Sequence, residues 1–186
     1  MKKGLWATGY GLRARTSAPA LLLALCALAT TPAFAADLNV RIQIPGLSVA
    51  EYHRPYVATW IENEDQSIAT HLAVWYQTDA KKEDGTQWLK DLRQWWRRGG
   101  RAETMPIDGV TGATRSVGEH QLSFKGGSKP LAGLKPGKYN LVVEATREVG
   151  GRELLRVPFE WPGTRKQHTT VQGKTELGTI TLDVSP

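Results

Sequence analysis

Apolar residues recur in seven short stretches of the chain. They alternate with polar residues at 38–44, 122–124, 139–145, 155–161 and 180–184, and they form denser apolar stretches at 55–62 and 68–77. In the first stretch, single polar residues separate Leu38, Val40 and Ile42. This two-residue period is typical of a strand with one buried face. Seven short strands predict a mainly β fold, and we expect an antiparallel β-sandwich of the immunoglobulin or transthyretin kind.

Turn residues join four of these stretches into two hairpins. The run Asn63-Glu64-Asp65-Gln66 separates residues 55–62 from 68–77, and such polar residues favour tight turns. Gly150 and Gly151 lie between residues 139–145 and 155–161, and glycine pairs are common in hairpin turns.

Residues 86–98 break the strand pattern. Their large apolar residues fall on one face of a helix: Trp88, Leu89, Leu92, Trp95 and Trp96. Gly99 follows as a residue that commonly ends a helix. The pattern therefore predicts one Trp-rich helix. The simplest interpretation is that its tryptophans cover the open end of the sandwich, since large aromatic side chains bury the most area. The alternative is that one of them lines a ligand site.

The first 35 residues have the organisation of a secretory signal peptide. Lys2, Lys3, Arg13 and Arg15 give a positive start, and residues 18–29 form an apolar run that is short for a membrane span. Ala33-Phe34-Ala35 places small residues at the two positions that a signal peptidase reads. We therefore expect cleavage after Ala35, which leaves residues 36–186 as a single periplasmic domain without membrane insertion.

Loss of the signal peptide changes the charge and the cysteine content. It removes four of the 24 Lys and Arg residues and none of the 18 Asp and Glu residues, so the net charge falls from +6 to about +2. A charge this small argues against nucleic acid as a partner. The single cysteine, Cys26, leaves as well, which excludes a disulfide, a thiolate nucleophile and a thiolate metal site in the mature domain.

One short segment carries candidate chemistry. Residues 105–118 predict a flexible, exposed loop, because the run from Asp108 to Ser116 holds two glycines and no bulky side chain between Thr111 and Thr114. Within this loop, one set of residues resembles the flavinylation motif of FMN-binding domains in bacterial respiratory complexes: Asp108, Thr111, Gly112, Ala113 and Thr114. The resemblance implies that an FAD:protein FMN transferase esterifies the FMN phosphate to the hydroxyl of Thr114.

The residues around the motif suit a covalently bound phosphate. A threonine hydroxyl is a poor nucleophile that needs a base or a metal beside it, and we expect the transferase to supply this. The resulting phosphodiester is an anion that cations can pair with. Arg115 is the adjacent candidate, and Arg97, Arg98 and Arg101 lie just upstream.

A second resemblance covers nearly the whole mature chain. Residues 50–58, 72–76, 88–98 and 173–178 look like predicted periplasmic proteins of domain of unknown function family 2271. That family has no assigned activity. The resemblance implies a setting beside the FMN transferase and PepSY-type membrane proteins, in electron transfer or iron acquisition.

Other candidate sites are weaker. The four histidines, His53, His71, His120 and His168, are scattered without metal-ligand spacing. We find no Ser-His-Asp order, paired carboxylates or phosphate-binding loop, and expect no catalysis by this chain alone. The sequence thus favours a periplasmic redox carrier with FMN on Thr114. The alternative is a non-redox binding module that holds a partner protein or a sugar at its aromatic end.

Overall fold

A computed structural model describes residues 36–79 and 85–186. The predicted signal peptide, its cleavage site and Cys26 lie outside these residues. Within them the chain forms nine strands: β1 (Asp37–Ile44), β2 (Tyr56–Glu62), β3 (Ile68–Tyr76), β4 (Thr111–Ala113), β5 (Gly118–Phe124), β6 (Gly137–Thr146), β7 (Arg152–Trp161), β8 (Gln167–Gln172) and β9 (Thr179–Ser185).

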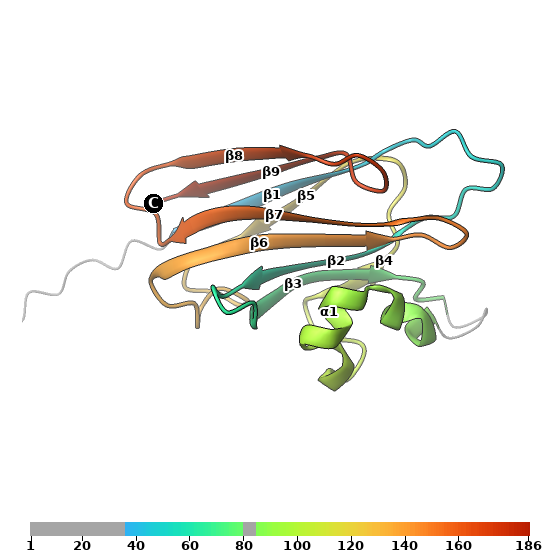
Figure 1. Ribbon diagram of the computed structural model, residues 1–186. Coiled ribbons are helices and arrows are strands. Elements are labelled where there is room, and N and C mark those ends of the chain that lie inside the picture. Colours follow the sequence, from blue (N-terminus) through green and yellow to red (C-terminus); the bar gives the residue numbers. More distant parts are fainter. Residues whose placement is uncertain (1–35, 80–84) are drawn as a thin grey trace, which may run out of the picture. The chain divides into compact units, whose positions relative to one another are not determined.

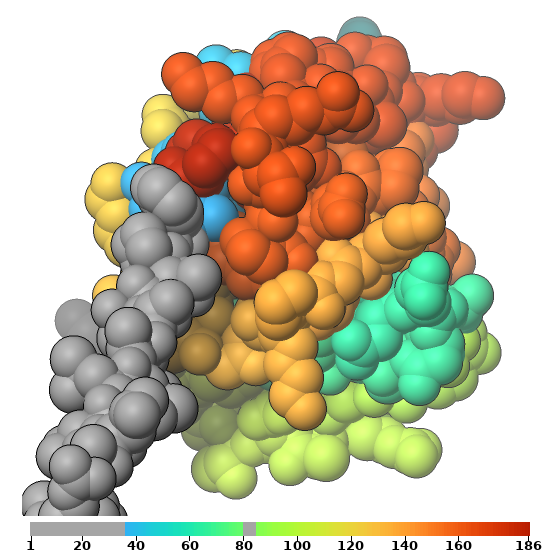
Figure 2. All heavy atoms as spheres, turned by 90° about the vertical axis from the view of Figure 1, so that its left-hand side faces the viewer, coloured from blue at the N-terminus to red at the C-terminus, as the bar shows by residue number. Residues whose placement is uncertain are grey.

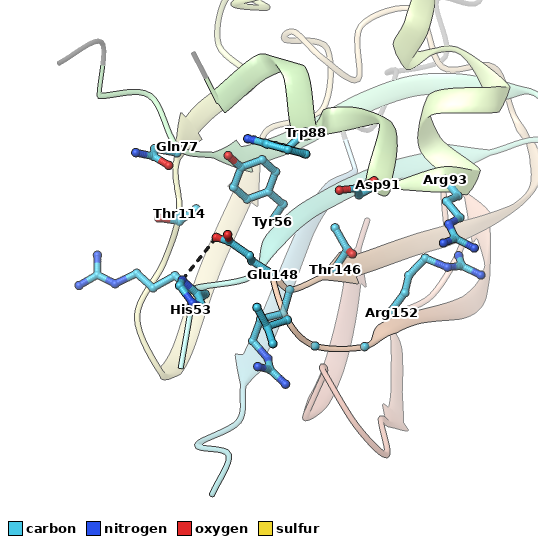
Figure 3. A pocket seen from close by; sticks show the side chains of 15 residues that line it. His53, Tyr56, Gln77, Trp88, Asp91, Arg93, Thr114, Thr146, Glu148 and Arg152 are labelled. Atoms are coloured by element: carbon cyan, nitrogen blue, oxygen red, sulfur yellow. Dashed lines mark ion pairs between the residues drawn. The ribbon is translucent and has the colours of Figure 1, made fainter. Parts of the chain in front are cut away.

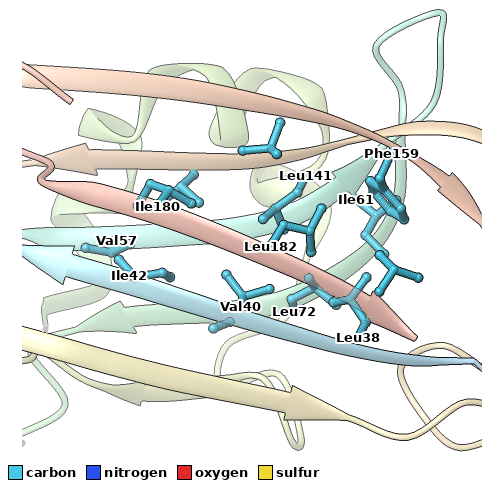
Figure 4. Packing of buried hydrophobic residues seen from close by; sticks show 14 of the residues in the cluster. Leu38, Val40, Ile42, Val57, Ile61, Leu72, Leu141, Phe159, Ile180 and Leu182 are labelled. Carbon is cyan, nitrogen blue, oxygen red and sulfur yellow. The ribbon is translucent and has the colours of Figure 1, made fainter. Parts of the chain in front are cut away.

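The strands form two packed sheets, one in the order β5-β1-β9-β8 and the other in the order β4-β3-β2-β6-β7 (Figure 1). All neighbours are antiparallel except β3 and β4, which run parallel. The predicted mainly β sandwich is therefore confirmed. The alternating side chains of β1 explain why the sheets pack: Leu38, Val40 and Ile42 are fully buried and face residues such as Leu141 of the opposite sheet (Figure 4).

Both predicted hairpins are present. In the β2–β3 turn, the amide of Asn63 donates to the carbonyl of Ser67 at 2.9 Å, and Gln66 takes a positive φ of 65°. In the β6–β7 turn, the amide of Arg147 donates to the carbonyl of Gly151 at 3.1 Å. This second turn matters below because it forms part of a pocket.

Two strands were not expected from the sequence. β8 alternates between half-buried and exposed residues at the edge of its sheet, and its side chains are mostly polar, so it lacks an apolar stripe. β4 has only three small residues, Thr111, Gly112 and Ala113. Its pairing with β3 shows that part of the predicted motif loop is a strand at the edge of the sheet.

The Trp-rich segment lies on the outer face of the five-stranded sheet and does not close an end of the sandwich. Figure 1 shows it along β2 and β3, and in Figure 2 it forms a separate layer beneath that sheet. Leu89, Leu92 and Trp95 are fully buried there against outward-facing residues such as Trp60 and Val142. The expected position was therefore wrong, because these central strands have apolar side chains on both faces.

The segment is also not one continuous helix. It contains a 3₁₀ helix, η1 (Gly85–Asp91), the α-helix α1 (Arg93–Arg98) and a second short 3₁₀ helix, η2 (Gly100–Ala102). Of the buried residues, Leu89 lies in η1, Leu92 between the two helices and Trp95 in α1. Trp88, the residue before Leu89, is 46 % exposed.

A buried carboxylate fixes the start of α1. Glu144 of β6 is fully buried, and its two oxygens accept from the amides of Gln94 at 3.0 Å and Trp95 at 2.8 Å. Arg152 donates to the same carboxylate at 2.7 Å. Because α1 has no side-chain cap of its own, Glu144 satisfies amides that a helix otherwise leaves unpaired.

Two carboxylates join the β6–β7 hairpin of one sheet to the β8–β9 loop of the other, each accepting hydrogen bonds from the opposite segment. Glu176, in the β8–β9 loop, accepts from Arg147 at 2.9 and 3.1 Å and from the amide of Gly151 at 2.7 Å. Glu153 of β7 accepts from the amides of Lys174, at 2.6 Å, and Leu177, at 2.9 Å. We call these contacts the sheet clamp.

Candidate functional site

The flavinylation-like motif begins in a turn and ends in β4. Asp108 is exposed in the turn, and Gly109 takes a positive φ of 69° that favours glycine. The hydroxyl of Thr111 accepts from the amide of Ile107 at 2.8 Å, which ties the turn to the strand. The hydroxyl of Thr111 therefore has a structural role in the turn.

Gly112 and Ala113 let the motif lie close against β3. A Cβ atom at Gly112 would be 3.3 Å from Cδ1 of Trp75, tighter than ordinary contact. Ala113 pairs with Tyr76 and is exposed. The expectation of a flexible turn was wrong for this half of the motif, because pairing with β3 satisfies the backbone and holds it extended.

Thr114 follows directly after β4, and its position is well determined by the sheet. Its amide donates to the carbonyl of Tyr76 at 3.1 Å, which extends the parallel ladder by one residue. The residue is half-buried and lines a pocket of about 770 Å³. The proposed acceptor hydroxyl therefore belongs to a residue in the wall of a ligand-sized pocket.

The pocket has an aromatic wall and several charged groups (Figure 3). Tyr56 and Trp88 supply the aromatic rings, and Tyr56 packs edge-on against Tyr76 with ring centroids 6.3 Å apart. The charged residues come from the β1–β2 loop, the Trp-rich segment and the β6–β7 hairpin: His53, Arg54, Asp91, Arg93, Arg147, Glu148 and Arg152. Such a mixture of apolar surface and a few polar groups is typical of small-molecule sites.

Local ion pairs order part of this lining. His53 lies 3.0 Å from Glu51 and 3.4 Å from Glu148, so it bridges the β1–β2 loop and the β6–β7 turn. Arg152 pairs with Glu144, the residue that caps α1. In the view of Figure 3, Thr114 lies on one side of the pocket and Arg93 and Arg152 on the other.

The arginines that the sequence suggested as partners of the phosphate do not line this pocket. Arg115 places its guanidinium 5.2 Å from the centroid of the buried Trp75 ring, next to the motif. Arg97 bonds to Gln94, and Arg98 bonds to Gln66 of the β2–β3 turn. Arg97, Arg98 and Arg101 do not line the pocket.

The pocket's cations could not be found from the sequence. Arg54, Arg93 and Arg152 come from three separate segments, and only the folded chain brings them to one pocket with Thr114.

The remaining histidines have individual partners in separate places. His120 bonds to the carbonyl of Ser116 at 2.7 Å, and His168 bonds to Asp183 at 2.6 Å. His71 accepts at Nδ1 from the indole N–H of Trp95, at 3.1 Å, and its Nε2 lies 3.3 Å from Glu103. Burial lowers the pKa of His71, and the nearby carboxylate only partly opposes this shift.

Comparison with known proteins gives a family but no close relative. No curated protein and no solved structure matches the chain. Within the described residues, no helix is long and apolar enough to cross a membrane. A family model described as "Predicted periplasmic protein (DUF2271)" matches residues 37–179, which include all of β1 to β8 and only the first residue of β9. The chain therefore belongs to the DUF2271 family of predicted periplasmic proteins.

Proposed function

We propose that this protein is a periplasmic electron carrier with FMN linked through a phosphoester to Thr114. The observation that carries the proposal is that the predicted acceptor, defined by the motif from Asp108 to Thr114, lines a ligand-sized pocket. In the transfer, the transferase breaks the pyrophosphate of FAD and joins the FMN phosphorus to Oγ of Thr114. AMP leaves, and the hydroxyl proton passes to a base of the transferase.

The residues of the pocket fit this cofactor. Its volume of about 770 Å³ lies within the usual range of small-ligand sites. Trp88 and Tyr56 offer apolar ring surface, and Arg54 and Arg93 offer positive charge for the anionic groups of FMN. FMN accepts and donates electrons when bound, and the chain's own residues would hold and orient it.

The position of the motif suits modification by a second protein. β4 is an edge strand of three residues, so a transferase needs to displace little structure to reach Thr114. Gly112 and Ala113, which directly precede Thr114, present little bulk. The proposed partners are this FAD:protein FMN transferase and, for electron exchange, a PepSY-type membrane redox protein.

Intact-mass measurement tests the proposal directly. Co-expression with an FMN transferase and export to the periplasm is expected to add the mass of FMN minus one water. Thr114→Val removes the acceptor hydroxyl and is expected to abolish this gain. Thr111→Ser is the matched control, because serine keeps the hydroxyl that accepts from Ile107. An unmodified wild-type chain, in cells where the transferase modifies its other targets, would contradict the proposal.

We also propose cleavage of the signal peptide between Ala35 and Ala36. The position is compatible with the fold, because β1 begins at Asp37, one residue after the new N-terminus. A cut here removes the signal without shortening the first strand. N-terminal sequencing of periplasmic protein is expected to begin at Ala36, and a start at Met1 would contradict it.

The second candidate is a non-redox module that binds a sugar in the same pocket. It is favoured by the exposed ring of Trp88 beside polar Asp91 and Gln77. Colour separates the two candidates, since flavinylated protein from its native host is yellow.

A further inference from the structure

Trp88 and Trp95 have opposite surroundings, although a spacing of seven residues would place them on the same face of one continuous helix. Trp95 is fully buried, whereas Trp88 remains 46 % exposed and lines the pocket that also contains Thr114. Burial of Leu89 directly after it fixes the turn of η1. An indole held at a pocket wall by a buried neighbour is available to stack on a planar ligand.

We propose that the pocket formed by Trp88, Tyr56 and Arg93 holds the isoalloxazine ring of the FMN on Thr114. The inference rests on the proposed function and adds to it the place of the ring. In Figure 3, the side chains of Tyr56 and Trp88 lie between Thr114 and Arg93. In that view, the aromatic side chains thus separate the tether at Thr114 from the cation.

Two structural supports keep the walls of this pocket in place. Glu144 binds the amides at the start of α1, which follows Trp88 in the chain. The sheet clamp holds the β6–β7 turn on the opposite side through Arg147 and Gly151. Pre-organised walls favour binding because less conformational freedom is lost when the ring enters.

The arrangement has two measurable consequences. A flavin stacked on an indole or phenol ring loses most of its fluorescence through electron transfer from that ring. A guanidinium beside the ring stabilises the more negative, reduced state and raises the midpoint potential. The first consequence reports on Trp88 and Tyr56, and the second on Arg93.

The fluorescence test uses the full-length, exported protein after its FMN content has been confirmed by intact mass. Trp88→Leu is expected to increase flavin emission severalfold per FMN. Trp96→Leu is the control. Trp96 belongs to the same segment, but it packs against the buried cluster around Trp95 on the outer face of the five-stranded sheet and does not line the pocket. Because the phenol ring of Tyr56 also quenches, the double variant Trp88→Leu with Tyr56→Phe removes both electron donors. Equal emission from the wild type and this double variant, with FMN attached to both, would overturn the ring position and leave the flavinylation proposal intact.

Redox titration provides the second readout. Arg93→Gln is expected to shift the midpoint potential to a more negative value. Arg97→Gln, a loss of the same charge from the same helix at a residue outside the pocket, is expected to leave it unchanged. Equal shifts in both variants would mean that Arg93 has no special position, which would contradict the inference. Absence of FMN from the wild-type chain would instead contradict the proposed function, on which the inference depends.

Discussion

At the scale of single residues, the Trp-rich segment divides structural from candidate functional side chains. Trp95 is buried in the cluster on the outer face of the sheet, and its N–H bonds to His71. We expect Trp95→Ala to lower the free energy of unfolding by about 3–5 kcal/mol. Trp88→Ala, at an exposed position, should cost less than about 1 kcal/mol. Urea unfolding of both variants checks this, and equal losses would contradict the division.

His71 makes the stability of this layer sensitive to acid. Burial lowers its pKa in the folded protein below the ordinary value of 6.5, so the unfolded chain binds the proton first as the pH falls. The contribution of His71 to the free energy of unfolding is therefore fully present above about pH 6.5 and decreases below it. Protonation at Nδ1 also removes the acceptor for Trp95.

The non-titrating variant His71→Asn isolates this effect from that of other histidines. We expect its unfolding free energy to change less than that of the wild type between pH 7.5 and pH 5.5, as measured by urea titration at both values. Equal changes in the two proteins would show that His71 does not contribute.

At the scale of elements, α1 depends on a residue that is distant in the sequence. Glu144 accepts from two amides of the first turn and from Arg152. We expect Glu144→Ala to cost about 2–3 kcal/mol, because these donors lose a charged acceptor. Hydrogen exchange of the amides from Arg93 to Arg98 should accelerate. Glu144→Gln keeps one carbonyl oxygen and should show a smaller effect. Unchanged exchange in Glu144→Ala would contradict the capping role.

The elements that were predictable are those with a strong local pattern. Strict alternation predicted β1, and a polar turn and a glycine pair predicted the two hairpins. The edge strands β4 and β8 lack apolar stripes and gain their order from pairing with a neighbour. The helix boundary at Leu92 is set by Glu144, 50 residues from Gln94 in the chain, so no local signal marked it.

The position of the Trp-rich segment did have a signal in the sequence. Residues 72–76 and 141–143 are unbroken apolar runs, which indicate a strand buried on both faces. Such a strand needs a covering layer outside the sandwich, and the Trp-rich segment supplies it. The candidate site was half predictable: the motif identified Thr114, whereas Trp88, Arg93 and Arg152 join it only through the tertiary fold.

At the scale of the whole molecule, the sheet clamp connects the two sheets beside the pocket. Arg147 is 8 % exposed and Glu176 4 %, so their ion pair is shielded from water. Glu153 strengthens the same connection from β7. Its partial burial would raise its pKa, but the amides of Leu177, Lys174 and Thr175 outweigh burial and lower it. This part of the stability is present above the carboxyl's ordinary pKa of 4.5 and is lost as the pH falls below it.

The clamp gives the last prediction. Glu176→Ala leaves the guanidinium of Arg147 buried without its partner, which typically costs about 3–5 kcal/mol. The double variant Arg147→Met with Glu176→Leu replaces the pair by apolar groups, and we expect it to be more stable than Glu176→Ala, since such replacements are often neutral. Urea unfolding of the single and double variants measures the coupling. If Glu176→Ala loses less than about 1 kcal/mol, the pair of Arg147 and Glu176 contributes little to holding the sheets together and only shapes the β6–β7 turn beside the pocket that Thr114 lines.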